Sequence, residues 1–69
     1  MNHSLDNIKN SEIRYLIDEY IHSERDRIIL KRIYADKIHY EPLAEELGLS
    51  VSTISRTYKK HKALIETLL

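Results

Sequence analysis

The 69-residue chain has no cysteine, tryptophan or phenylalanine, and it has only one glycine and one proline. Without cysteine there is no disulfide framework, zinc ribbon or thiol nucleophile. Its apolar runs, such as Ile28–Leu30, are far shorter than the roughly 20 residues that cross a bilayer. The polar N-terminus also lacks the apolar stretch of a secretory signal. We therefore expect a cytoplasmic protein with no membrane partner.

What the chain does have is apolar residues at helical spacing, with few helix breakers between them. The pattern predicts helices from residue 10 or 11 to about 22, from 23 to about 36, over 40–47, and from a cap at Ser50 to about 68. We expect one small all-α domain of four helices. Its parts are an N-terminal arm or short helix over 1–10 (a turn at 4–9), a two-helix platform over 11–36, and a helix-turn-helix over 40–68.

Local signals mark the helix ends and the core. Ser23 and Asp26 resemble a capping box that opens the second helix. Three tyrosines on apolar faces, Tyr20, Tyr34 and Tyr58, are expected in the core. The apolar arc of the last helix is expected to comprise Val51, Ile54, Tyr58, His61, Leu64, Ile65 and Leu68.

Residues 40–60, YEPLAEELGLSVSTISRTYKK, carry the most specific pattern. Ala44 is small enough for two helices to cross closely, and Gly48 can adopt the positive φ of a sharp turn. Leu47, Leu49 and Ile54 supply an apolar wedge between the helices. This spacing indicates a helix-turn-helix, with an ordinary helical hairpin as the alternative.

This stretch resembles the promoter-recognising fourth region of bacterial sigma factors and related small phage regulators. The residues that match are Tyr40, Leu43, Ala44, Leu47, Leu49, Ser50, Ile54, Lys59 and Lys60. His39 and Pro42 depart from the family pattern, which has Ser or Thr and an acidic residue there, and the linker near Ala35–Ile38 is one residue longer. The resemblance implies a transcription regulator of phage or mobile-element type, which acts on double-stranded DNA as a homodimer or with a larger partner such as RNA polymerase.

One face of the last helix is polar and cationic. In a helix-turn-helix, the first residues of the recognition helix, here residues 51–62, reach base edges in the major groove, and later ones reach phosphates. The free N–H groups that open the preceding helix also suit a phosphate. We therefore assign Ser52, Thr53 and Arg56 to bases, and Ser55, Lys59, Lys60, His39 and Tyr40 to the DNA backbone, with Lys62 as a further candidate.

The formal net charge of zero seems at first to argue against a DNA partner. Residues 1–36 carry 6 basic and 7 acidic side chains, residues 37–50 carry 1 and 3, and residues 51–69 carry 4 and 1. The zero is thus a cancellation between a mildly acidic platform and a basic recognition helix. Affinity for DNA follows the local charge of the contacting face.

Other functions find little support in the sequence. No catalytic constellation is recognisable, so we expect no enzyme, and the four histidines have no spacing typical of a metal site, so no metal or cofactor is expected. We expect His61 to be half-buried and hydrogen-bonded, in preference to a pH switch. Tyr15 and Ile28 lie off the apolar stripes and are candidate interface residues.

Two alternative functions remain. The helix-turn-helix can serve as a protein-interaction module that modulates RNA polymerase or another regulator without binding DNA. A DNA-recognition head of a phage packaging subunit is a third hypothesis, which would need a ring-forming assembly.

Overall fold

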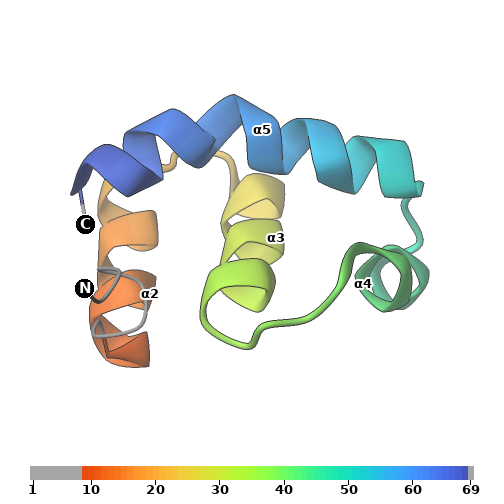
Figure 1. Cartoon of the computed structure of the whole chain (residues 1–69), viewed down its shortest axis with the longest axis horizontal. Coiled ribbons are helices and arrows are strands. Elements are labelled where there is room, and N and C mark those ends of the chain that lie inside the picture. Colours follow the sequence, from red (N-terminus) through yellow and green to blue (C-terminus); the bar gives the residue numbers. More distant parts are fainter. Residues whose placement is uncertain (1–8, 69) are drawn as a thin grey trace, which may run out of the picture.

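The computed structural model describes residues 9–68. This part of the chain consists of helices joined by short connections. Its helices are α2 (Asn10–Tyr20), α3 (Glu24–Tyr34), α4 (Tyr40–Leu47) and α5 (Val51–Leu68). As Figure 1 shows, α5 runs along one side of the molecule, across the ends of α2 and α3, with α4 beneath its first turns. The predicted four-helix, all-α fold is confirmed for these residues. The turn expected at residues 4–9 lies outside the described residues except for Lys9.

The first helix is shorter than the sequence predicts. It ends at Tyr20 because Ile21 adopts an extended conformation, with φ −107° and ψ 120°, and turns its side chain into the core. Ile17 and Ile13, one and two turns earlier, are also buried. Tyr20 is thereby left at the helix end with 46% of its surface exposed, so its assignment to the core is wrong.

The second helix begins with half of the predicted capping box. The Asp26 backbone N–H donates to Ser23 Oγ at 3.3 Å, which satisfies one free donor of the first turn. The Asp26 carboxylate, however, bonds to Arg25 and His61. The capping-box prediction is therefore right for the serine and wrong for the acid.

Three residues join α4 to α5, and they turn the chain as predicted. Gly48 is left-handed, with φ 69° and ψ 32°. Its N–H donates to the Glu45 carbonyl and that of Leu49 to the Ala44 carbonyl, a Schellman ending. Ser50 then caps α5, since its Oγ accepts from the Thr53 N–H at 3.1 Å. The two helices so joined form a helix-turn-helix unit.

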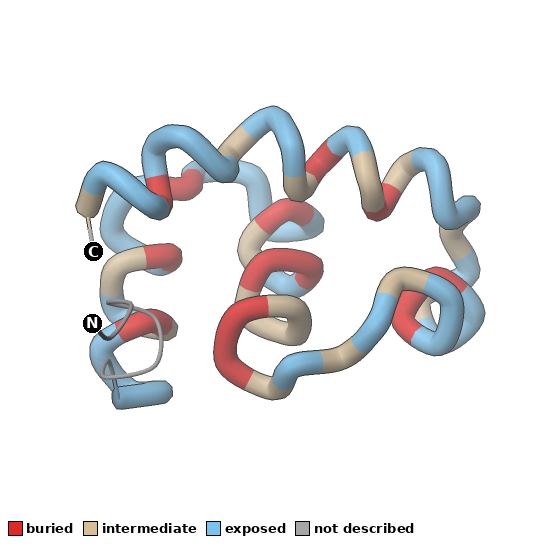
Figure 2. The backbone as a smooth tube through the Cα atoms, viewed as in Figure 1, coloured by how far each residue is buried: buried red, intermediate tan, exposed pale blue. Residues whose placement is uncertain are grey.

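The core consists of two clusters of buried side chains, and α5 takes part in both. One cluster joins α2, α3 and the far half of α5 through residues such as Ile17, Leu30 and Ile65. The other joins α3, α4 and the first half of α5 through Ile29, Leu43, Ala44 and Ile54, with Leu47 and Leu49 packed against it. Figure 2 shows the buried segments of α5 on the side that faces the other helices.

The buried arc of α5 is narrower than the sequence predicts. Val51 and Leu64 are exposed and Tyr58 is only half-buried, whereas Thr57 is buried. α5 rests on the other helices along one side only, so apolar residues at the edges of its arc reach solvent. Thr57 lies close enough to the centre of the contact to be covered.

No helix within residues 9–68 combines the length and the apolar character that crossing a membrane requires.

Candidate nucleic-acid interface

The outward face of α5 carries the cations that the sequence assigns to DNA. Arg56, Lys59 and Lys60 are exposed, and so is Ser52 near the start of the helix. Figure 2 shows this exposed side along the length of α5, opposite the buried segments. None of these three cations makes a salt bridge to another described residue. The face can therefore offer its positive charge to a ligand.

A small group of hydroxyls surrounds the first turn of α5. Ser50 Oγ lies 2.9 Å from Thr53 Oγ1 and 3.2 Å from Ser52 Oγ. Thr53 is half-buried, so its hydroxyl is engaged locally and turns only partly outward. Arg56 Nε donates to the Ser52 carbonyl at 3.4 Å, which lays the arginine stem along the helix. Of the three predicted base-facing residues, Ser52 and Arg56 are the more accessible.

One flank of α5 is a cationic groove of about 290 Å³. The groove contains Thr53 and Arg56, which the sequence assigns to DNA bases, and Lys60, which it assigns to the DNA backbone. It also contains Arg25 of α3, which the sequence analysis missed. Its lining consists of Arg25, Thr53, Arg56, Thr57 and Lys60. Three guanidinium or ammonium groups thus border one recess.

A buried carboxylate holds Arg25 beside this groove. Arg25 Nε and Nη2 both donate to Asp26 Oδ1, at 3.2 and 3.1 Å. The other oxygen, Oδ2, lies 2.8 Å from His61 Nε2 on α5. Burial raises the pKa of Asp26, but the hydrogen bonds from His61 and Arg25 outweigh it and hold the pKa below its ordinary value. Asp26 is therefore an ionised link between α3 and α5.

His61 itself agrees with the prediction of a half-buried, hydrogen-bonded histidine. Its side chain is 15% exposed and that of Asp26 only 3%. The sequence could not identify the partner, because the two residues lie 35 positions apart.

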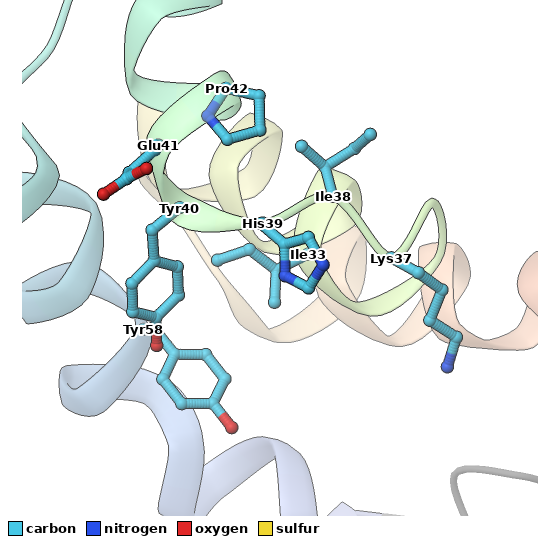
Figure 3. A pocket seen from close by; sticks show the side chains of 8 residues that line it. All are labelled: Ile33, Lys37, Ile38, His39, Tyr40, Glu41, Pro42 and Tyr58. Atoms are coloured by element: carbon cyan, nitrogen blue, oxygen red, sulfur yellow. The ribbon is translucent and has the colours of Figure 1, made fainter.

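The opposite flank of α5 is a larger groove of about 600 Å³ between the α3–α4 linker, the start of α4 and Tyr58. In Figure 3 the Tyr40 and Tyr58 rings lie next to one another, with Lys37 at the far end of the groove. The two ring centroids are 6.0 Å apart. Lys62 Nζ lies 5.9 Å from the centre of the Tyr58 ring. The groove is lined by Ile33, Lys37, Ile38, His39, Tyr40, Glu41, Pro42 and Tyr58.

His39 and Tyr40, which the sequence predicts to contact the DNA backbone, line this second groove. His39 is the N-cap of α4, and its side chain makes no capping hydrogen bond. The N–H groups of the first turn have no acceptor within the helix. Tyr40 is half-buried and its ring packs near that of Tyr58, so only part of the Tyr40 side chain is accessible to a ligand. Lys37 adds a cation that the sequence analysis did not single out.

Ser55, which the sequence also predicts to contact the DNA backbone, is half-buried on α5 and lines neither of these two grooves. The predicted interface residues are exposed: Tyr15 at 63% and Ile28 at 43%. Ile28 borders an apolar groove of about 360 Å³ with Leu47 and Leu49, and Tyr15 is not part of it. The structure therefore does not unite the two residues in one recess.

An ion-pair chain ties the platform to the helix-turn-helix. Arg32 donates to Asp36 Oδ2 at 2.8 Å and to Glu46 Oε1 on α4 at 2.5 Å, and Arg14 donates to Asp36 Oδ1 at 2.7 Å. The bond from Arg32 lowers the pKa of Asp36. These contacts help to orient α4 relative to α3.

Within residues 9–68 no group of three or more His, Asp or Glu side chains is arranged to hold a metal ion. Comparison with protein-family models, curated proteins and solved structures finds no match to this chain.

Proposed function

We propose that the protein is a sequence-specific DNA-binding transcription regulator that inserts α5 into the major groove. The observation that carries the proposal is the placement of cations on both flanks of α5, a helix whose outer side is exposed. Arg25 and Lys60 border one groove beside α5, and Lys37 borders the other. A helix in the major groove has a phosphate backbone on each side, so cations on both flanks suit that position.

In this proposal the first turns of α5 read sequence. Arg56 can donate two hydrogen bonds to a guanine, and Ser52 can reach a neighbouring base edge. Lys59 and Lys60, farther along, neutralise phosphates. The resemblance to sigma region 4 fits this division of roles and suggests a regulator of phage or mobile-element type that acts in the cytoplasm.

A single copy offers only a few phosphate contacts. Since non-specific DNA affinity rises with the number of phosphates neutralised, one copy should bind weakly and lose affinity steeply with salt. We therefore include a homodimer, or a complex with a larger partner such as RNA polymerase, in the proposal.

The test begins with selection of binding sites from random duplexes, followed by affinity measurements at low salt. We expect Arg56→Ala to weaken binding to the selected site by on the order of tenfold and to relax its preference at one base pair. Lys59→Ala should weaken binding to all duplexes similarly and reduce the slope of log affinity against log salt by about 0.9.

Lys9→Ala is the matched control, because it removes the same charge at the start of α2, the end that lies away from α5 (Figure 1). It should leave both the affinity and the salt slope close to wild type. If Arg56→Ala and Lys59→Ala bind as wild type does at low salt, the proposal is wrong.

One observation favours a second function, that of a protein-interaction module. The groove of Ile28, Leu47 and Leu49 is mainly apolar and lies at the turn of the helix-turn-helix. This function predicts no salt-dependent DNA binding, but a stable protein complex that Ile28→Glu or Tyr15→Ala disrupts.

A further inference from the structure

One buried carboxylate is shared by two basic side chains from different helices. Asp26 Oδ1 accepts from Arg25 of α3, and Asp26 Oδ2 accepts from His61 of α5. Of the three residues, Arg25 lines the smaller cationic groove beside α5. Asp26 and His61 do not line it, but the shared carboxylate connects both of them to Arg25. The charge of this cluster therefore contributes to the potential at the groove.

That charge depends on the protonation state of His61. A neutral imidazole with its proton on Nε2 donates to Asp26, and the charges of Arg25 and Asp26 then cancel. Protonation at Nδ1 leaves the hydrogen bond in place and gives the cluster a net charge of plus one. Histidine is the side chain that ordinarily changes charge between about pH 5 and pH 8.

The groups around His61 leave the added charge uncompensated. α3 contributes Asp26 and Arg25, which already pair with each other. On α5, its sequence neighbours Lys60 and Lys62 are cations, and the side chain one turn earlier is the phenol of Tyr58. α2 packs on α5 through apolar Ile13, Ile17 and Ile21. A proton on His61 therefore raises the positive potential of the flank.

We propose that His61 makes DNA binding pH-dependent, by adding a positive charge to the Arg25 and Lys60 flank as the pH falls. Asp26 is the positioning residue, since it holds Arg25 at the groove and connects it to His61. This inference rests on the proposed function, because it concerns the charge of the same DNA-facing surface.

The experiment measures affinity for a mixed-sequence duplex at about pH 8 and about pH 5.5, at constant low ionic strength, for wild type and His61→Gln. The wild type should bind on the order of three- to tenfold more tightly at the lower pH. His61→Gln should lose most of this gain, because an amide can donate to Asp26 but cannot be protonated there. Far-ultraviolet circular dichroism at both pH values verifies that the variant is folded.

Two further variants separate the contributions. His39→Gln removes the other histidine that borders a groove on α5, and it should keep the part of the response that belongs to His61. Arg25→Ala should weaken binding at both pH values and keep the pH response, because His61 still gains its proton.

The outcomes distinguish the two proposals. If the wild type binds duplexes and His61→Gln shows the same pH response, the inference is overturned and the proposed function stands. If the wild type binds no duplex at either pH, the proposed function fails and the inference fails with it.

Discussion

At the scale of single residues, Lys37 has the least favourable backbone conformation. It is the one non-glycine residue within 9–68 with a positive φ, at 60°. A side chain in the left-handed region costs roughly 1–2 kcal/mol, and glycine avoids this cost while losing some chain entropy. We predict that Lys37→Gly raises the free energy of unfolding by about 0.5–1 kcal/mol, measured by urea denaturation.

Lys37→Ala serves as the control, because it also removes the ammonium group but keeps a Cβ. It should give no gain in stability. If alanine and glycine stabilise the protein equally, the effect comes from the lost charge and not from the backbone.

The residues of the Asp26 cluster also show where sequence reasoning ends. The sequence predicted Asp26 at the first turn of α3 and His61 on the inner face of α5, and each position is right. Their contact depends on how α5 crosses α3, which no local pattern determines. Arg25 was missed for the same reason: on its own helix it is an ordinary exposed cation, and only the crossing brings it beside Lys60.

At the scale of secondary-structure elements, the start of α5 depends on one serine. Ser50 Oγ accepts from the Thr53 N–H and contacts two neighbouring hydroxyls. Loss of a serine N-cap typically costs about 1 kcal/mol. We predict that Ser50→Ala lowers the free energy of unfolding by about that amount, measured by thermal or urea unfolding.

Ser50→Asn and Ser50→Asp keep a capping acceptor and should retain most of the stability. If the proposed function is right, Asp should in addition weaken DNA binding, because it places a negative charge at the end of α5 that the proposal places against the bases. Equal stability of Ser50→Ala and wild type would show that the cap contributes little here.

The helices and their inner faces were largely predictable from the sequence, since periodic apolar residues, Gly48 and Ser50 act locally. The errors fall where an element ends or where its neighbours are missing. Tyr20 has the right spacing for the core, but α2 ends there and Ile21 takes the buried position. Val51 and Leu64 lie on the edges of the α5 arc, and only the packing decides how wide that arc is.

At the scale of the whole molecule, acid should weaken the contact between α3 and α5 that the ionised Asp26 carboxylate makes with His61. The pKa of Asp26 is lower in the folded chain than its ordinary value, so the carboxylate contributes stability above that ordinary pKa, about 3.9. This contribution is lost as the pH falls through the folded-state pKa. We predict that Asp26→Asn is about 2 kcal/mol less stable than wild type at pH 7, and that the difference shrinks toward zero in acid.

Urea unfolding of both proteins at a series of pH values measures this difference. Other carboxylates with lowered pKa values, such as Asp36, affect both proteins alike and cancel in the comparison. A difference that stays constant down to the most acidic pH would contradict the role of Asp26 as an ionised link.

The one-sided burial of α5 has a consequence for how this protein can change over time. Arg56 and Lys59 face outward, whereas Ile54 and Ile65 hold the same helix to the two core clusters. Side chains on the outer side are not part of the core packing. Single substitutions there can therefore change what the surface binds while each variant still folds. The same separation makes the outer face of α5 suitable for randomised libraries on a fixed 69-residue framework.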